Sequence, residues 1–130
     1  MQSEWYSKLI KPDWAPPSEI FGPVWTFLYA IIIISFGAVF YKIFRKEIPI
    51  IIALPFVLNL FFNLIFTYLQ FVLKNNYLAM IDILLVLGTL IWGMFIIWPY
   101  VRWIAIINIP YLMWVIFATI LQITITYLNR

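Results

Sequence analysis

The chemistry open to this sequence is limited first by the side chains that it lacks. It contains no histidine and no cysteine, so the commonest metal and haem ligands and the usual proton carrier near neutral pH are missing. We therefore expect no metal site, no resident cofactor and no catalysis by thiolate or imidazole. The remaining polar chemistry belongs to amide, hydroxyl and indole groups, and to one acid inside an apolar stretch, Asp82.

Amide and hydroxyl groups recur at helical spacing in the second apolar stretch of the chain. The set consists of Asn59, Asn63, Thr67 and Gln70. Residues three or four apart share one face of a helix, and a polar face is costly in lipid, so this face is expected to point into a bundle. Two interpretations stay open: amides that join helices, each bond worth about 0.6 kcal/mol, or the lining of a cavity, which we favour for Asn59.

The last apolar stretch combines a second polar face with a deep indole. Its polar residues are Asn108, Thr119, Gln122 and Thr126, with Tyr111 on the adjoining surface. Pro110 is expected to kink the helix, because it lacks an N–H and clashes with the preceding turn. Trp114 lies about 18 Å along this helix from Arg102, too deep for a membrane-interface aromatic. The pattern suggests an internal pocket without naming a ligand.

Asp82 has two interpretations at this stage. One is an interfacial carboxylate within reach of water and of Lys74, and the other is a proton or cation site inside the bundle. We favour the interfacial carboxylate, because Asp82 lies close in sequence to the loop that contains the lysine.

The elements that position these groups are long apolar segments. Hydrophobic residues make up 66% of the chain and charged residues 10%, which is far from the roughly 25% charged residues of soluble domains. Uncharged runs of about 18 residues or more predict helices that cross a bilayer. We expect an all-α membrane protein with four transmembrane helices in one domain, 1–130. The predicted elements are a loop over 1–19 and helices over about 20–42, 48–72, 77–99 and 102–128.

The net charge of +3 is small and scattered along the chain. Nucleic acid is therefore not an expected partner, whereas membrane lipid is. Basic residues fall equally on the two expected sides of the bundle, so the positive-inside rule leaves the orientation open.

Two blocks of the sequence resemble the translocator protein family, known in bacteria as the tryptophan-rich sensory protein, TspO. The first is "WYSKLIKPDWAPPSEIFGPVWTFLY", which begins at Trp5, and the second is "IPYLMWVIFATIL", which begins at Ile109. Family members usually have five membrane helices, and here the first block starts almost at Met1, so we expect the first helix to be missing. Either the given start lies downstream of the true one, or this is a four-helix variant. Phe62 replaces a tryptophan that is common in the family, and Gln122 replaces an asparagine.

The resemblance implies a cavity near the Pro-Pro loop that binds hydrophobic planar small molecules, notably porphyrins and in some members sterols. The residues expected to contact the ligand are Trp14, Phe21, Trp25, Tyr29, Asn59, Phe62, Tyr111, Trp114 and Ala118. Those matching Trp25 and Trp114 are connected with porphyrin binding and its light-dependent breakdown. Family members often form dimers, so a homodimer is one expected assembly.

Three classes of function follow from these observations. The preferred one is binding for sensing, transport or tetrapyrrole handling. A light-dependent porphyrin-degrading enzyme is the alternative, although no general acid, base or metal site supports catalysis in the dark. The third is a structural or assembly protein in which the polar faces only join helices.

Overall fold

The computed structural model describes residues 10, 12–15, 20–69, 73 and 75–129, apart from the side chains of Phe21 and Thr67. The elements in this part of the chain are α2 (Phe21–Phe44), the 3-10 turn η2 (Ile50–Ile52), α3 (Ala53–Thr67), α4 (Asn76–Ile97), α5 (Arg102–Ile107) and α6 (Ile109–Leu128). No strand occurs among these described residues. The prediction of an all-α fold is confirmed.

Three of the helices, α2, α4 and α6, are long and apolar enough to cross a membrane, and a shorter apolar helix covers Ile50–Phe66. Large apolar side chains cover the outer surface of the bundle. Ile33, Phe44 and Phe95 are 72%, 84% and 79% exposed, respectively. Exposed apolar surface on this scale is stable against lipid but not against water. The chain is therefore an integral membrane protein that crosses the bilayer several times.

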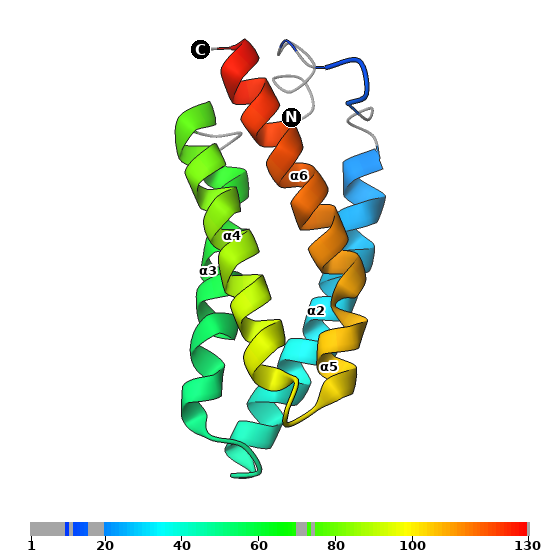
Figure 1. Cartoon of the computed structure of the whole chain (residues 1–130), viewed down its shortest axis with the longest axis vertical. Helices are drawn as coiled ribbons and strands as arrows, with labels where there is room; N and C mark the ends of the chain where they lie inside the picture. Colours follow the sequence, from blue (N-terminus) through cyan, green and yellow to red (C-terminus); the bar gives the residue numbers. More distant parts are fainter. Residues whose placement is uncertain (1–9, 11, 16–19, 70–72, 74, 130) are drawn as a thin grey trace.

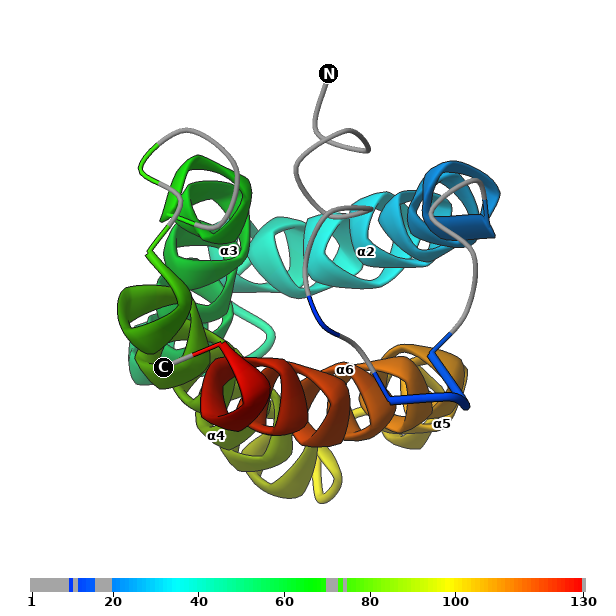
Figure 2. The same ribbon diagram turned by 90° about the horizontal axis from the view of Figure 1, so that it is seen from above.

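α2, α3, α4 and the consecutive pair α5 and α6 run alternately down and up the bundle (Figure 1). Seen from above, α2 and α6 form two facing rows, with α3 and α4 at one end (Figure 2). The described part of the N-terminal loop lies over the C-terminal half of α6. Two hydrogen bonds fix it there, from the Ile10 N–H to Asn129 Oδ1 at 3.1 Å and from Asn129 Nδ2 to the Ile10 carbonyl at 2.8 Å.

The second predicted helix is divided and shorter than expected. Pro49 is the N-cap of η2, and α3 begins only at Ala53. Pro55 therefore lies in the first turn of α3, where its missing N–H has no helical partner to lose. The predicted end of this helix near residue 72 falls partly outside the described residues.

The last predicted helix, 102–128, is two helices. The chain leaves helical geometry at Asn108, between α5 and α6, and Pro110 follows in the first turn of α6. The expectation of a proline-induced break is confirmed, because the ring removes one backbone donor and fills the space of the preceding turn. The Asn108 side chain helps to hold the break, since its Nδ2 donates to the Ile104 carbonyl at 2.7 Å.

Capping interactions explain where α4 begins and α2 ends. Asn75 is the N-cap of α4, and its side-chain oxygen accepts from the Leu78 N–H at 3.0 Å. At the end of α2, Lys46 has φ 60, and the N–H groups of Lys46 and Glu47 donate to the carbonyls of Ile43 and Lys42. This is a Schellman ending with lysine at the left-handed position that glycine prefers.

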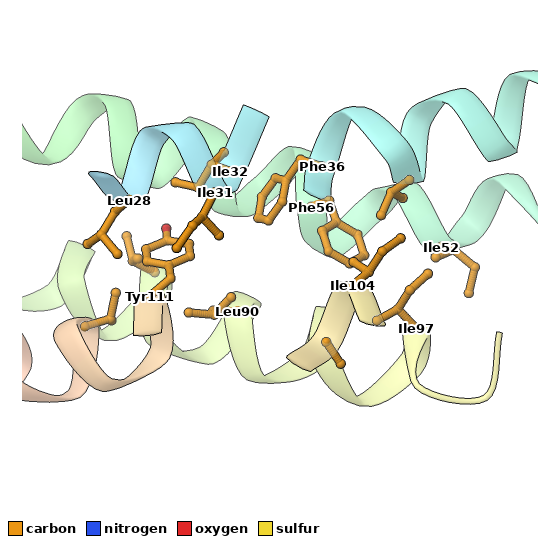
Figure 3. Packing of buried hydrophobic residues seen from close by; sticks show 14 of the residues in the cluster. Leu28, Ile31, Ile32, Phe36, Ile52, Phe56, Leu90, Ile97, Ile104 and Tyr111 are labelled. Carbon is orange, nitrogen blue, oxygen red and sulfur yellow. The ribbon is translucent and has the colours of Figure 1, made fainter. Parts of the chain in front are cut away.

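The apolar core runs along the middle of the bundle (Figure 3). At its centre the rings of Phe36 from α2 and Phe56 from α3 meet edge to face, 4.9 Å between centroids. Gly93 of α4 permits this contact, because a Cβ there would lie 3.2 Å from the Phe56 ring. Three helices thus meet at one closely packed level.

Candidate functional site

A chain of side-chain hydrogen bonds crosses the bundle. The Tyr29 hydroxyl donates to Asn63 Oδ1 at 3.2 Å, and Asn63 Nδ2 donates to the Tyr111 hydroxyl at 2.6 Å. The Tyr111 hydroxyl then donates to Asn59 Oδ1 at 2.9 Å, and Asn59 Nδ2 donates to Thr89 Oγ1 at 3.2 Å. Every bond in the chain runs in the same sense, so the three inner members, Asn63, Tyr111 and Asn59, each donate and accept.

Four helices supply the members of this chain. Tyr29 comes from α2, Asn59 and Asn63 from α3, Thr89 from α4 and Tyr111 from α6. Tyr111 is 0% exposed, and its hydroxyl lies among the apolar side chains of the core in Figure 3. A buried hydroxyl without partners would be costly, so the amides stabilise it there. Both amides therefore join helices, which was one of the two interpretations for their face of α3.

The aromatic candidates form two groups. On α2, the rings of Trp25 and Tyr29 are 5.6 Å apart and tilted. On α6, Phe117 contacts Trp114 at 5.3 Å and also contacts Trp14 of the N-terminal loop, edge to face at 5.8 Å. The second group thus joins the loop to the deep part of α6. Both groups present broad aromatic faces of the kind that planar ligands stack against.

The described loop residues extend this attachment to α6. Ala15 packs against the small apolar cluster of Leu121 and Ile125, together with Phe117. With the two hydrogen bonds between Ile10 and Asn129, the loop is held at two places on the same helix. Trp14 is thereby positioned above the aromatic residues of α6, although 49% of its surface stays exposed.

The other predicted ligand contacts are less closely connected. Phe62 is half-buried, packs against the core and meets the neighbouring Phe61 ring at 5.5 Å. Ala118 is half-buried against the same core. Phe21 is the first residue of α2, and its side chain lies outside the description. Of the predicted ligand contacts, only Tyr29, Asn59 and Tyr111 are joined by hydrogen bonds among the described residues, through Asn63.

A second polar contact ties α6 to the start of α4. Thr126 Oγ1 donates to the Asn76 carbonyl at 3.1 Å, and Gln122 Nε2 donates to Thr126 Oγ1 at the same distance. Gln122 and Thr126 are 4% and 3% exposed, respectively. The prediction that the polar face of the last helix points into the bundle is confirmed.

Asp82 departs from its preferred interpretation. Its side chain is only 3% exposed on the buried face of α4, so the expectation of a carboxylate in reach of water is wrong. Neither carboxylate oxygen has a hydrogen-bond partner among the described residues, and Lys74 lies outside them. The distance of Asp82 from the nearest loop along the sequence indicated how deep it lies in the helix. It did not indicate that the side chain would lie on the buried face of α4.

Three contributors were not among the predicted site residues. Asn63 links Tyr29 to Tyr111, and its position four residues after Asn59 was a usable signal. Phe117 joins the two tryptophans of its group. Thr89 was overlooked, because a single threonine in an apolar helix commonly bonds its own backbone, as its hydroxyl also does here to the Leu85 carbonyl at 2.8 Å.

A helical membrane bundle with two aromatic groups and a buried amide–tyrosine chain is the class of protein that these features define. The sequence pattern of the TspO/MBR family matches residues 1–128. The chain belongs to this family.

Similar proteins are found in several bacteria. The chain is 36% identical over 129 residues to the uncharacterized membrane protein YtaB of Bacillus subtilis, covering 99% of this chain and 83% of that one. It is 36% identical over 125 residues to the tryptophan-rich protein TspO of Bacillus cereus, covering 96% and 80%. It is 29% identical over 129 residues to the tryptophan-rich sensory protein of Cereibacter sphaeroides, covering 97% and 77%.

Proposed function

We propose that this protein binds hydrophobic planar ligands, with porphyrins as the model class, between α2 and α6 beneath the N-terminal loop. The observation that carries the proposal is the aromatic group of Trp14, Trp114 and Phe117, in which the loop and the deep part of α6 share one set of ring contacts. Indole and phenyl faces give a tetrapyrrole a large, rigid surface at small entropic cost. Family membership supports the same proposal.

The facing helix contributes the second aromatic surface. Trp25 and Tyr29 project from α2 with their rings in contact, and α2 and α6 face each other in Figure 2. Small-molecule sites are mostly apolar and carry a few placed polar groups. In this site the polar group is Asn63, which accepts from the Tyr29 hydroxyl and donates to the buried Tyr111 hydroxyl. The residues favour binding over chemistry, because the described aromatic groups contain no acid or base.

The test is quenching of tryptophan fluorescence in detergent-purified protein titrated with protoporphyrin. The chain has seven tryptophans, so replacing one leaves ample signal. We expect saturable quenching, and we expect Trp114→Phe to weaken the affinity about two- to tenfold, since one aromatic contact is worth roughly 0.5–1.5 kcal/mol. Trp25→Phe should act in the same direction.

The matched control is Trp92→Phe. Trp92 lies on α4 and is 41% exposed, so its replacement removes the same fluorophore from a surface away from the proposed site. Equal affinities for wild type, Trp114→Phe and Trp92→Phe would reject the site assignment. The absence of saturable quenching in wild type would reject porphyrin binding itself and leave the structural or assembly role as the better account.

A further inference from the structure

Asp82 is a buried acid whose hydrogen-bonding capacity is unused among the described residues. Its side chain is 3% exposed, and both oxygens lack a hydrogen-bond partner among the described residues. An ionised carboxylate removed from water without donors costs several kcal/mol, so a buried acid of this kind either takes up a proton or meets a partner that supplies the missing bonds. An intramembrane acid is by default a candidate functional group.

Asp82 lies between the two residues of α4 whose carbonyl groups accept hydrogen bonds from other helices. On one side, Asn59 of α3 donates to the Val86 carbonyl at 3.0 Å. On the other, Thr126 of α6 donates to the Asn76 carbonyl at 3.1 Å. Asp82 lies between Asn76 and Val86 on the same buried face. Its carboxyl group therefore faces the inside of the bundle, about one turn from the amide–tyrosine chain.

The polar neighbours of that face are already engaged. Asn59, Asn63 and Tyr111 bond one another, and Thr119 Oγ1 donates to the Val115 carbonyl of its own helix at 2.7 Å. The other buried side-chain oxygen without a partner among these residues is Asn108 Oδ1, which lies at the break between α5 and α6. At the level of the proposed site, Asp82 is the group left with free capacity.

Charges on the packed helices do not neutralise Asp82. The described helices α3 and α6 contain no charged residue, and α4 contains none besides Asp82 itself. The charged residue of α2 is Lys42, in its last turn, where it pairs with Glu47 at 3.9 Å. The titratable groups that face the interior are the hydroxyls of Tyr29 and Tyr111, both engaged with Asn63.

We propose that Asp82, as a neutral carboxylic acid, is the polar anchor of the ligand site and donates its proton in a hydrogen bond to a carbonyl or carboxylate oxygen of the ligand. This inference rests on the proposed function and narrows it to planar ligands that carry such an oxygen at their edge. Loss of this proton would remove the donor and repel a ligand carboxylate, so the anchor acts only while Asp82 is neutral.

Three porphyrins that share one ring system test this anchor by fluorescence quenching. Protoporphyrin carries two propionic acid groups, its dimethyl ester keeps the carbonyl oxygens without charge, and etioporphyrin has only alkyl groups. Wild type is expected to bind the first two about tenfold more tightly than etioporphyrin, the effect of one good hydrogen bond. Asp82→Leu should abolish this preference and leave etioporphyrin affinity unchanged.

Two further variants separate the anchor from a general effect on the bundle. Asp82→Asn retains a donor, so it should keep the preference. Thr119→Val removes a buried hydroxyl that bonds only its own helix, and it should leave the preference unchanged. Equal binding of all three porphyrins by wild type, or a preference that survives in Asp82→Leu, would overturn the proposal.

Isotope labelling gives a measurement that does not depend on replacing Asp82. The chain has only two aspartates, Asp13 and Asp82, so carboxyl-¹³C-aspartate in an Asp13→Asn background reports on Asp82 alone. The signal should be that of a neutral acid, shifted by protoporphyrin and unmoved by etioporphyrin. A carboxylate signal in the protoporphyrin complex would overturn the anchor. Failure of every porphyrin to bind would instead reject the proposed function.

Discussion

Removal of the Tyr111 hydroxyl should destabilise the bundle by about 1–3 kcal/mol. Tyr111→Phe keeps the ring, so no cavity forms, but it deletes the acceptor for Asn63 Nδ2 at 2.6 Å and the donor to Asn59 Oδ1 at 2.9 Å. Interhelical hydrogen bonds in membranes average about 0.6 kcal/mol each and reach about 1.7 kcal/mol. Two such bonds at a fully buried residue give the stated range.

The measurement is reversible unfolding of the purified protein by SDS in mixed micelles, followed by circular dichroism. Tyr77→Phe is the control, because the Tyr77 side chain is 53% exposed. A double-mutant cycle of Tyr111→Phe with Asn59→Ala should give a coupling energy of at least about 0.5 kcal/mol, as expected for residues in contact. If Tyr111→Phe unfolds at the same SDS fraction as Tyr77→Phe, the amide–tyrosine chain does not hold the helices together.

Other substitutions test the packing and the helix ends by the same unfolding assay. Gly88→Ala should stabilise the protein by up to about 1 kcal/mol, because nothing lies within 4 Å of the added methyl group. Gly93→Ala should destabilise it by about 1 kcal/mol, because the added methyl group meets the buried Phe56 ring at 3.2 Å. Lys46→Gly should stabilise by up to about 1 kcal/mol, since it relieves a left-handed lysine at φ 60. Asn129→Ala should leave stability nearly unchanged but speed deuterium exchange in residues 10–15, because both hydrogen bonds to the loop are lost. A stable Gly93→Ala, an unstable Lys46→Gly or unchanged loop exchange would each contradict the corresponding contact.

The helices were predictable because uncharged apolar runs are nearly sufficient to define membrane spans. Their internal breaks were less so. Pro110 gave a correct signal, but the chain departs from the helix at Asn108, whose side chain bonds the Ile104 carbonyl. Pro55 lies just after the 3-10 turn, in the first turn of α3, where a missing N–H costs little. A proline marks a discontinuity, and only the neighbouring capping geometry decides on which side of it the helix begins.

The site was partly predictable for a different reason. Spacing along one helix identifies a polar face, so Asn59 and Gln122 were expected inside the bundle, and both are buried. Spacing does not say which groups on other helices will meet that face. The partnership of Asn63 with both tyrosines, and the contact of Trp14 with Phe117, depend on how helices far apart in sequence are placed side by side.

The distribution of polar contacts indicates where a ligand would gain access. α3, α4 and α6 are linked through Asn59, Tyr111 and Thr126. Among the described residues of α2, Tyr29 makes the one side-chain hydrogen bond to another helix, since Ser35 bonds its own backbone at the Ile31 carbonyl. The Tyr29 bond goes to Asn63 of α3, so among the described residues separation of α2 from α6 breaks no side-chain hydrogen bond between these two helices, whereas separation of α4 from its neighbours breaks several. The two aromatic groups lie on α2 and α6, a pair of helices whose separation breaks the fewest hydrogen bonds in the described part of the chain.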